Sequence, residues 1–268
     1  MQSKFYQPDG RRAEKVHELF ATIARRYDVL NDLMSGGLHR HWKRRLVEMA
    51  GGKGGAGSVE REAESGEEGR RTKGEARKHK RVLDLCCGTG DLALGFARSG
   101  ARVTGVDFTA EMLQVAMTRV AQYSSTSALQ HPISWLRADA LVLPFPDDLF
   151  DVVSVGYGLR NLADIERGLQ EIRRVLRPGG KLLSLDFGRP EPTMLRWFYF
   201  GYLRMVLPFL GRIFCGDPDT HGYILASLQD YPAQRGIKEL MESIQYQDCG
   251  FVEFVGGTMA INFGSKPG

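Results

Sequence analysis

The chain has 268 residues, of which 43% are hydrophobic, 25% are charged and 32 are glycine, and this composition excludes fibrous and wholly disordered proteins. Its length fits one α/β domain with a core that needs no disulfides, and the four cysteines show no C-x-x-C spacing. The net charge of +4 is uneven, because residues 1–81 hold 19 Lys and Arg against 12 Asp and Glu. This basic excess fits nucleic acid, an anionic membrane surface or a solvated face.

The first 80 residues divide into a helical part and a glycine-rich part. Apolar residues at helical spacing predict helices over residues 11–50, with a break near residues 35–37 and a second helix over about 39–49. Residues 51–80 contain eight glycines and only four apolar residues, so they cannot bury enough surface to offset the entropy of ordering. We therefore expect an N-terminal helical cap over 1–50, followed by a disordered insertion over 51–80.

From residue 81 onward, short β-branched or leucine-rich runs alternate with helical patterns, which is typical of βαβ units and a parallel sheet. Pro178, Gly179 and Gly180 end the helix before the fifth strand. The tail predicts two more strands, joined by an antiparallel turn at Gly256 and Gly257. Strands are expected over 81–86, 102–106, 133–138, 150–155, 181–187 and twice within 251–265. The fold class is α/β, with helices on both faces of a seven-stranded, mostly parallel sheet, in a single domain over 1–268 whose core is 81–268.

The loop after the first predicted strand indicates a ligand site. Gly88 and Gly90 let the backbone approach a ligand closely, and the following helix directs free N–H groups toward it. Residues 88–93 also match the loose G-x-G-x-x-A pattern of dinucleotide sites, with Asp107 placed to bind ribose hydroxyls. An NAD-dependent oxidoreductase therefore stays open as one alternative.

Acidic residues favour S-adenosylmethionine over NAD at this loop. Asp84 inside the strand and Asp91 at the loop's end would repel the negative charge of a pyrophosphate. They suit a sulfonium and an amino group, which are positively charged. Asp139, after the third strand, is placed to accept a hydrogen bond from an adenine amine. Two structural alternatives stay open, in which Asp84 only caps the loop and Asp139 only begins a turn.

Four segments together resemble the successive motifs of class I S-adenosylmethionine-dependent methyltransferases: VLDLCCGTGD (82–91), GVDFTAEML (105–113), RADALVLPFPDDLFDVV (137–153) and RRVLRPGGKLLSLDFGRP (173–190). More narrowly, YDVLNDLMSGGLHRHWKRRL (27–46), GLRNLAD (158–164) and LDFGRP (185–190) resemble the ubiquinone/menaquinone biosynthesis C-methyltransferases, whose demethylmenaquinone branch is the nearest. The match covers nearly all of the chain except residues 51–80. Two departures touch the site: Cys86 and Cys87 replace smaller residues, and Gly156 stands where some members have serine.

The resemblance implies a Rossmann-like fold and methyl transfer to a ring carbon of a polyprenylated quinol, with demethylmenaquinol as the first candidate. Its predicted cofactor, S-adenosylmethionine, would contact Asp84, Gly88, Thr89, Gly90, Asp107, Asp139, Ala140 and Gly156. The predicted catalytic residues are Arg160, Asn161, Tyr27 and His39, because the loop after strand four faces the methyl group and the helical cap closes over the acceptor. For His39 a packed or capping role stays open, and for Arg160 a salt bridge to Asp164. No metal is expected.

Residues 193–215 form the most apolar and aromatic stretch of the chain. Arginines at 196, 204 and 212 interrupt it and Pro208 would kink a helix, so a lid or wall for the prenyl tail is favoured over a membrane span, with a buried helical excursion as the alternative. No stretch of 18 apolar residues and no secretory leader is visible, so we expect a cytoplasmic protein that touches the inner face of the membrane transiently.

Other functions are weighed against this one. A nucleic-acid methyltransferase is disfavoured because Gly-Tyr-Gly-Leu-Arg-Asn replaces the N-P-P-Y-like tetrapeptide that accompanies flipped bases, so no nucleic-acid partner is expected. A non-catalytic cofactor-binding subunit stays open. The oligomeric state is also open, with a homo-oligomer as one alternative.

Overall fold

The computed structural model describes residues 12–24, 27–51, 79–127, 129–215, 227–228 and 231–268. A seven-stranded sheet with the order β3-β2-β1-β4-β5-β7-β6 forms its centre. Strands β1 to β5 are parallel, β7 runs antiparallel to β5, and β6 runs antiparallel to β7. The expected α/β class and mostly parallel seven-stranded sheet are therefore confirmed. Most of the predicted insertion over 51–80, namely residues 52–78, lies outside the described residues.

The strands lie close to their predicted positions. They span β1 Arg81–Leu85, β2 Arg102–Asp107, β3 Ser134–Arg137, β4 Phe150–Gly156, β5 Leu176–Phe187, β6 Gln247–Phe254 and β7 Met259–Ser265. The turn between the last two strands includes Gly256 and Gly257, both with positive φ, as predicted. The fifth strand begins five residues early. Leu176 pairs with Phe150 before a bulge, and the amide of Gly179 donates to the carbonyl of Lys266, so the Pro-Gly-Gly segment belongs to the strand instead of only ending a helix.

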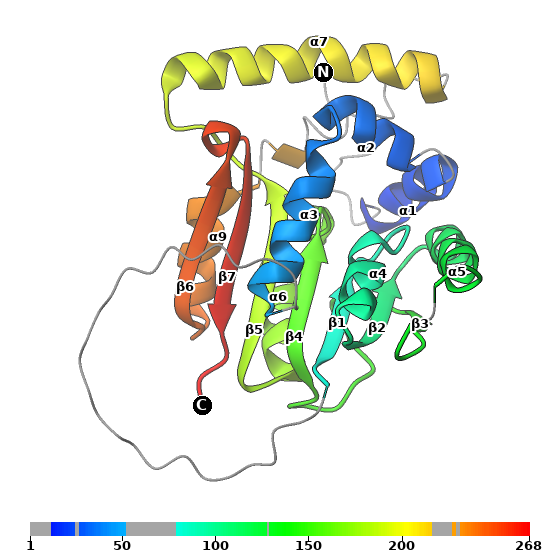
Figure 1. The fold of residues 1–268 in the computed structure, drawn as a ribbon. Helices are drawn as coiled ribbons and strands as arrows, with labels where there is room; N and C mark the ends of the chain where they lie inside the picture. Colours follow the sequence, from blue (N-terminus) through cyan, green and yellow to red (C-terminus); the bar gives the residue numbers. More distant parts are fainter. Residues whose placement is uncertain (1–11, 25–26, 52–78, 128, 216–226, 229–230) are drawn as a thin grey trace.

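Helices cover both faces of the sheet (Figure 1). On one face, α3 (Leu38–Met49) packs beside α4 (Asp91–Arg98), and Trp42, Leu46 and Phe96 share one hydrophobic cluster with the strands. The other face carries α6 (Ile165–Val175) and α9 (Ala233–Ser243), whose Ile172 and Ile237 are fully buried. Helix α5 (Ala110–Ser124) packs against β2 and β3. A segment of the N-terminal cap, α3, is thus also one of the layers that bury the sheet.

Three further helices lie beyond the carboxyl ends of the parallel strands (Figure 1). They are α1 (Arg12–Ile23), α2 (Tyr27–Ser35) and α7 (Thr193–Cys215). The predicted break at residues 35–37 exists, because Gly36 and Gly37 both take a positive φ between α2 and α3. The helix α7 is assigned without interruption through Pro208. Ligands bind at this end of open parallel sheets, so these helices form the roof of a site.

Candidate functional site

The loop between β1 and α4 is held open by its own backbone and by one carboxylate. Gly88 and Gly90 have φ of 53° and 81°, values that glycine adopts without strain. Asp107, at the end of β2, accepts hydrogen bonds from the Gly88 amide at 2.8 Å through Oδ2 and from the Thr109 amide at 2.9 Å through Oδ1. Asp107 therefore fixes the relative position of two loops at the mouth of the sheet.

A first cavity, the cofactor cavity, lies beyond the ends of β1, β2 and β4 and has a volume of about 130 Å³. Seven of the predicted site residues line it together: Tyr27, Gly88, Asp107, Asp139, Ala140, Gly156 and Asn161. Asp139 also accepts a hydrogen bond from the Leu141 amide, so it makes a turn as well as facing the cavity. A Cβ on Gly156 would lie 2.7 Å from Leu92 Cδ1, so a serine at this position would require the Leu92 side chain to move.

A small annex of about 30 Å³ adjoins the cofactor cavity and contains its most buried charge. Asp84 is 0% exposed, and its Oδ1 accepts from the Ser154 hydroxyl at 2.8 Å, whereas Oδ2 has no hydrogen-bond partner. Burial raises the pKa of Asp84 to about 7, although the Ser154 hydroxyl, the Ala93 amide and the charge of Lys43 act to lower it. An unpaired carboxylate oxygen in such a place suits a cationic ligand group, and the nearby Ala93 amide of α4 leaves the capping alternative for Asp84 open.

Two other predicted residues of the glycine loop, Thr89 and Gly90, do not line the cofactor cavity. Thr89 lines the annex and donates from its hydroxyl to Asp28 Oδ1 at 2.8 Å. Gly90 lines none of the described cavities. A Cβ there would lie 2.9 Å from the Trp135 ring and 3.0 Å from Ala116 Cβ, so this glycine is required by packing at the start of α4.

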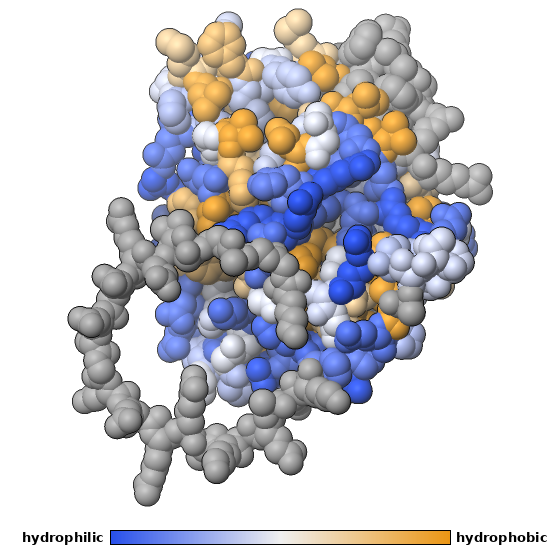
Figure 2. All heavy atoms as spheres, viewed as in Figure 1, coloured by the Kyte–Doolittle hydropathy of each residue, from blue (hydrophilic) through white to orange (hydrophobic). Residues whose placement is uncertain are grey.

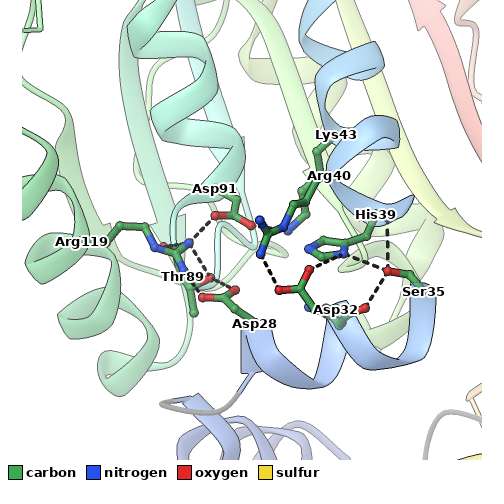
Figure 3. Close-up of polar contacts among 10 residues, drawn as sticks. Asp28, Asp32, Ser35, His39, Arg40, Lys43, Thr89, Asp91 and Arg119 are labelled. Atoms are coloured by element: carbon green, nitrogen blue, oxygen red, sulfur yellow. Dashed lines mark hydrogen bonds and ion pairs between the residues drawn. The ribbon is translucent and has the colours of Figure 1, made fainter. Parts of the chain in front are cut away.

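An ionic cluster fastens the cap to the cofactor loop (Figure 3). Asp91 accepts from Lys43 of α3 at 2.7 Å and pairs with Arg119 of α5, and Arg119 also pairs with Asp28 of α2. The pKa of Asp91 is lowered because the charges and hydrogen bond of Lys43 and Arg119 outweigh its burial. Since sequence positions 28, 43, 91 and 119 meet here, the cap and the loop hold one another in place.

A second cavity, the apolar chamber, lies beneath α7 between the cap and the last strands, with a volume of about 230 Å³. Its wall is largely aromatic and aliphatic, and it includes Leu38, Trp42, Phe187, Tyr199, Leu203 and Met259. Tyr157 lines this chamber, the cofactor cavity and the annex, so all three spaces adjoin one residue.

His39 belongs to the apolar chamber and is 3% exposed. Its Nδ1 lies 2.9 Å from the Ser35 hydroxyl and 3.7 Å from Asp32 Oδ1 (Figure 3). The pKa of His39 is lowered by burial first and then by the charge of Lys43, against the opposing charge of Asp32. The neutral form of the imidazole is therefore favoured. His39 is both packed among neighbouring side chains and in contact with the chamber.

Arg160 and Asn161 follow β4 in the short helix Leu159–Asn161. The Arg160 guanidinium is buried and pairs with Asp186 at 2.5 Å, not with Asp164, whose carboxylate instead caps α6 by accepting from the Arg167 amide. The proposed Asp164 pairing is thus wrong, because Asp164 points along its own helix. Asn161 lines the cofactor cavity, and its Oδ1 is buried without a partner.

Several lining residues were not singled out from the sequence. His17 and Phe20 of α1 line the cofactor cavity, and the His17 ring meets Phe108 edge-on at 5.4 Å between centroids. His17 Nδ1 is buried without a partner. The spacing of 17 and 20 is a helical one, but only the fold shows that this face covers the cavity and not the core. Lys43 and Arg119 were missed because their partner Asp91 is distant in sequence.

The helix α7 presents a strongly apolar outer surface. Trp197 is 72% exposed, and Met194, Phe198 and Met205 are also exposed, while Leu203 and Tyr199 face inward. Hydrophobic side chains gather over this helix at the top of the molecule (Figure 2). Within the described ranges, no helix has the length and apolar character needed to cross a bilayer.

Known proteins resemble this chain over almost its full length. It is 35% identical to the ubiquinone/menaquinone biosynthesis C-methyltransferase UbiE of Cellvibrio japonicus over 97% of the chain and 94% of that protein. It is 34% identical to UbiE of Stutzerimonas stutzeri over 97% of the chain and 92% of that protein. A crystal structure of an S-adenosylmethionine-dependent methyltransferase from Thermotoga maritima matches its fold with a TM-score of 0.57 and 16% identity, over 93% of this chain and 99% of that one.

A family model also matches the chain. The model of the ubiE/COQ5 methyltransferase family matches residues 9–266, which include both the cap and the sheet. The glycine loop, the carboxylates of Asp84 and Asp107, and the cavity at the strand ends agree with that match. The chain therefore belongs to the ubiE/COQ5 methyltransferase family, and its cofactor is S-adenosylmethionine.

Proposed function

We propose that this protein methylates a ring carbon of a polyprenylated quinol, with demethylmenaquinol as the first candidate acceptor and a benzoquinol intermediate as the second. One observation carries the proposal: a cavity that contains the carboxylates of Asp107 and Asp139 and an apolar, aromatic chamber adjoin at Tyr157. The first suits a charged nucleoside cofactor, and the second suits a hydrophobic ring with a prenyl tail. The names of the relatives, which refer to ubiquinone and menaquinone biosynthesis, support the same acceptor class.

The residues of the cofactor cavity fit S-adenosylmethionine. Asp107 and Asp139 offer carboxylates for ribose hydroxyls and an adenine amine, and Phe108 and Met112 supply apolar walls. In the annex, the unpaired Oδ2 of Asp84 suits the amino group of the methionine part. When bound, the cofactor supplies an electrophilic methyl group on a sulfonium.

A ring carbon becomes a nucleophile when a neighbouring hydroxyl loses its proton, and His39 is the residue we assign to accept that proton. The Ser35 hydroxyl donates its only hydrogen to the Asn31 carbonyl at 2.7 Å, so it accepts from His39 Nδ1. The proton on Nδ1 leaves a lone pair on Nε2. The lowered pKa of His39 keeps this ring neutral near pH 7, which is the form a base requires.

Tyr27 and Asn161 complete this part of the proposal. Tyr27 begins α2 and lines both the cofactor cavity and its annex, so it separates bound ligands from solvent. Burial raises the pKa of the Tyr27 hydroxyl, which keeps it protonated. A catalytic role for Arg160, as a fixed cation near a phenolate, stays a prediction.

We further propose that α7 covers the prenyl tail and touches an anionic membrane surface from the cytoplasmic side. The apolar chamber lies under this helix, and Trp197, Phe198 and Met205 are exposed on its outer face. Arg204, on the same helix, is also exposed and offers charge for lipid headgroups. A lipid-borne acceptor would reach the chamber from that surface without crossing water.

The experiment combines purified protein, methyl-labelled S-adenosylmethionine and chemically reduced quinones, with products identified by mass. We expect the mass of demethylmenaquinol to rise by one labelled methyl group. Transfer of the label to RNA, or no transfer to any quinol, would contradict the proposal. Vesicle flotation tests the membrane contact: Trp197→Glu should reduce binding to vesicles with anionic lipid. Loss of turnover with short-tail soluble quinols in this variant would instead show that Trp197 supports the fold.

A further inference from the structure

Tyr157 has a backbone conformation that is unfavourable for a tyrosine. It follows β4 directly and has a φ of 60°, in the left-handed region that non-glycine residues rarely adopt. Its amide donates to the Leu185 carbonyl at 2.7 Å. Its carbonyl accepts from Arg160 Nη1 at 2.9 Å and from Asn161 Nδ2 at 3.2 Å. Three hydrogen bonds thus stabilise a backbone conformation that is unfavourable for tyrosine. Such strained conformations are common at ligand-binding sites.

Tyr157 is a buried residue that borders all three cavities. It is 8% exposed, its ring packs edge-on against Phe187 at 5.9 Å, and Lys43 Nζ lies 5.9 Å from the ring centroid. Its hydroxyl is buried and makes no hydrogen bond. Buried hydroxyl groups are nearly always paired, so an unpaired one beside a cavity indicates a partner that comes from outside the chain.

The other tyrosines of the apolar chamber are already satisfied. The Tyr199 hydroxyl donates to the Thr258 carbonyl at 3.4 Å, and the Tyr202 hydroxyl donates to the Met34 carbonyl at 3.1 Å. Tyr157 alone among the chamber's three tyrosines keeps its hydroxyl unpaired, and it is also the one that borders the cofactor cavity.

From this placement we propose that the Tyr157 hydroxyl binds the acceptor, by donating a hydrogen bond to a ring oxygen of an aromatic diol held across the chamber and the cofactor cavity. This inference rests on the proposed function and adds the residue that recognises the oxygen. Burial raises the pKa of Tyr157 well above its ordinary value, so the group is a neutral donor. A donor of this kind stabilises the negative charge that a diol oxygen gains on losing its proton.

Arg160 and Asn161 gain a second role from the same geometry. Both donate to the Tyr157 carbonyl, and Arg160 is itself fixed by Asp186. They act as positioning residues for Tyr157, whatever else they contribute. A buried Arg160 that does not line the described cavities can still control acceptor binding through this contact.

The test is Tyr157→Phe, which removes one oxygen and keeps the ring. We expect kcat/KM for a reduced short-tail demethylnaphthoquinone to fall by about 10-fold or more, the scale of a hydrogen bond to a charged group. KM should rise because the oxygen loses a donor, and kcat should fall because its developing negative charge is less stabilised. The dissociation constant for S-adenosylmethionine should stay within about twofold. The Tm should not fall, since an unpaired buried hydroxyl is removed.

Tyr246→Phe is the matched control. Its hydroxyl is also buried, but it donates to the Leu169 carbonyl at 2.9 Å, away from all three cavities. This variant should lower Tm and leave kcat/KM unchanged. The double variant of Tyr157→Phe with Asn161→Ala checks the positioning role, because Asn161→Ala should raise the acceptor KM in the wild-type background and add little in the Tyr157→Phe background.

Three outcomes would overturn the inference: an unchanged kcat/KM in Tyr157→Phe, a loss of cofactor affinity that matches the loss of rate, or full additivity in the double variant. If Tyr157→Phe does not fold, Tyr157→His and Tyr157→Leu decide the question, because only histidine keeps a ring donor, and an equal acceptor KM in these two variants rejects the inference. Calorimetry with anaerobic 1,4-dihydroxynaphthalene separates this inference from the proposed function. Weaker binding to Tyr157→Phe supports the contact even if no quinol is methylated, and equal binding by both proteins rejects it.

Discussion

The cofactor cavity and the apolar chamber are neighbours, but they are built in different ways. The cofactor cavity is formed mainly by loops that directly follow β1, β2, β3 and β4, with backbone groups and carboxylates at the strand ends. The chamber takes its wall from α2, α3, β5, α7 and β7, which are far apart in the sequence. Polar hydrogen bonds fix the first, whereas side-chain packing shapes the second.

This difference predicts how the two regions respond to change. In the cofactor cavity, a carboxylate such as Asp107 organises backbone amides, so its removal should affect ligand affinity. In the chamber, His39 is the base that we propose for the acceptor, so its removal should affect turnover. The ionic cluster around Asp91 and Arg119 joins the two regions.

The largest effect is expected on the chamber side, from His39→Gln. Loss of a base typically costs about 10²–10⁴-fold in rate, so kcat should fall on that scale while the dissociation constant for S-adenosylmethionine is unchanged. In the wild type, kcat should fall as pH drops through the pKa of His39, which lies below 6.5, because only the neutral ring accepts a proton. Steady-state kinetics over pH 5–8 measures the loss of kcat in the variant and the pH dependence of kcat in the wild type. A wild-type rate in the variant would remove His39 from the mechanism.

Asp107→Ala gives the next largest effect and acts on the cofactor side. The carboxylate accepts from two loop amides and faces the cavity, and hydrogen bonds to a charged group are worth about 1.5–3 kcal/mol, or roughly 10- to 100-fold in affinity. Calorimetry with S-adenosylmethionine gives the dissociation constant. Binding as tight as in the wild type would mean that the loops keep their shape without Asp107.

The pH dependence of cofactor affinity tests the buried charge of Asp84. Its pKa of about 7 lies above the ordinary value of 3.8, so the free protein holds this carboxyl partly protonated at neutral pH. A cationic amino group needs the ionised form, and we expect affinity to rise about 10-fold between pH 6 and pH 8. In Asp84→Asn the affinity should be lower and flat over this range. The same pH slope in both proteins would assign it to another group.

Arg119→Ala tests the connection between the two regions. Its ion pairs to Asp28 and Asp91 are partly exposed, and pairs of that kind are worth about 0.2–1 kcal/mol each. We expect both the cofactor dissociation constant and the acceptor KM to rise by about two- to fivefold. Arg98→Ala, which loses only a contact to the Tyr123 ring, is the control. A change in one parameter alone would show that the cluster serves only one region.

The smallest effect is expected from removing residues 53–78 and joining the ends with a short linker. Lys80 Nζ donates to the Ala50 carbonyl at 2.5 Å, so the two sides of this segment are adjacent. They lie at the amino-terminal end of β1, at the opposite end of this strand from the cavities. Turnover and both affinities should stay within about twofold, as surface loops tolerate large changes in length. A collapse of turnover in a folded variant would give the segment a function.

The sequence by itself determined the sheet and most of the cofactor site. Strand-forming runs are continuous, and residues that end successive parallel strands must meet at one edge, so Gly88, Asp107, Asp139 and Asn161 could be grouped without coordinates. The turn at residues 256–257 could also be predicted from local sequence, because glycine adopts a positive φ freely.

Only the tertiary structure decided which distant side chains meet. The spacing of residues 193–215 left open whether this segment is buried or forms a lid, and the structure shows one helix with Leu203 buried and Trp197 exposed, while the lid stays a prediction. Likewise, Arg160 pairs with Asp186 and not with the nearby Asp164, and Tyr157 gains an unpaired hydroxyl at the meeting of three cavities. Such contacts join residues far apart in sequence, and their geometry depends on how the layers pack, which no local pattern encodes.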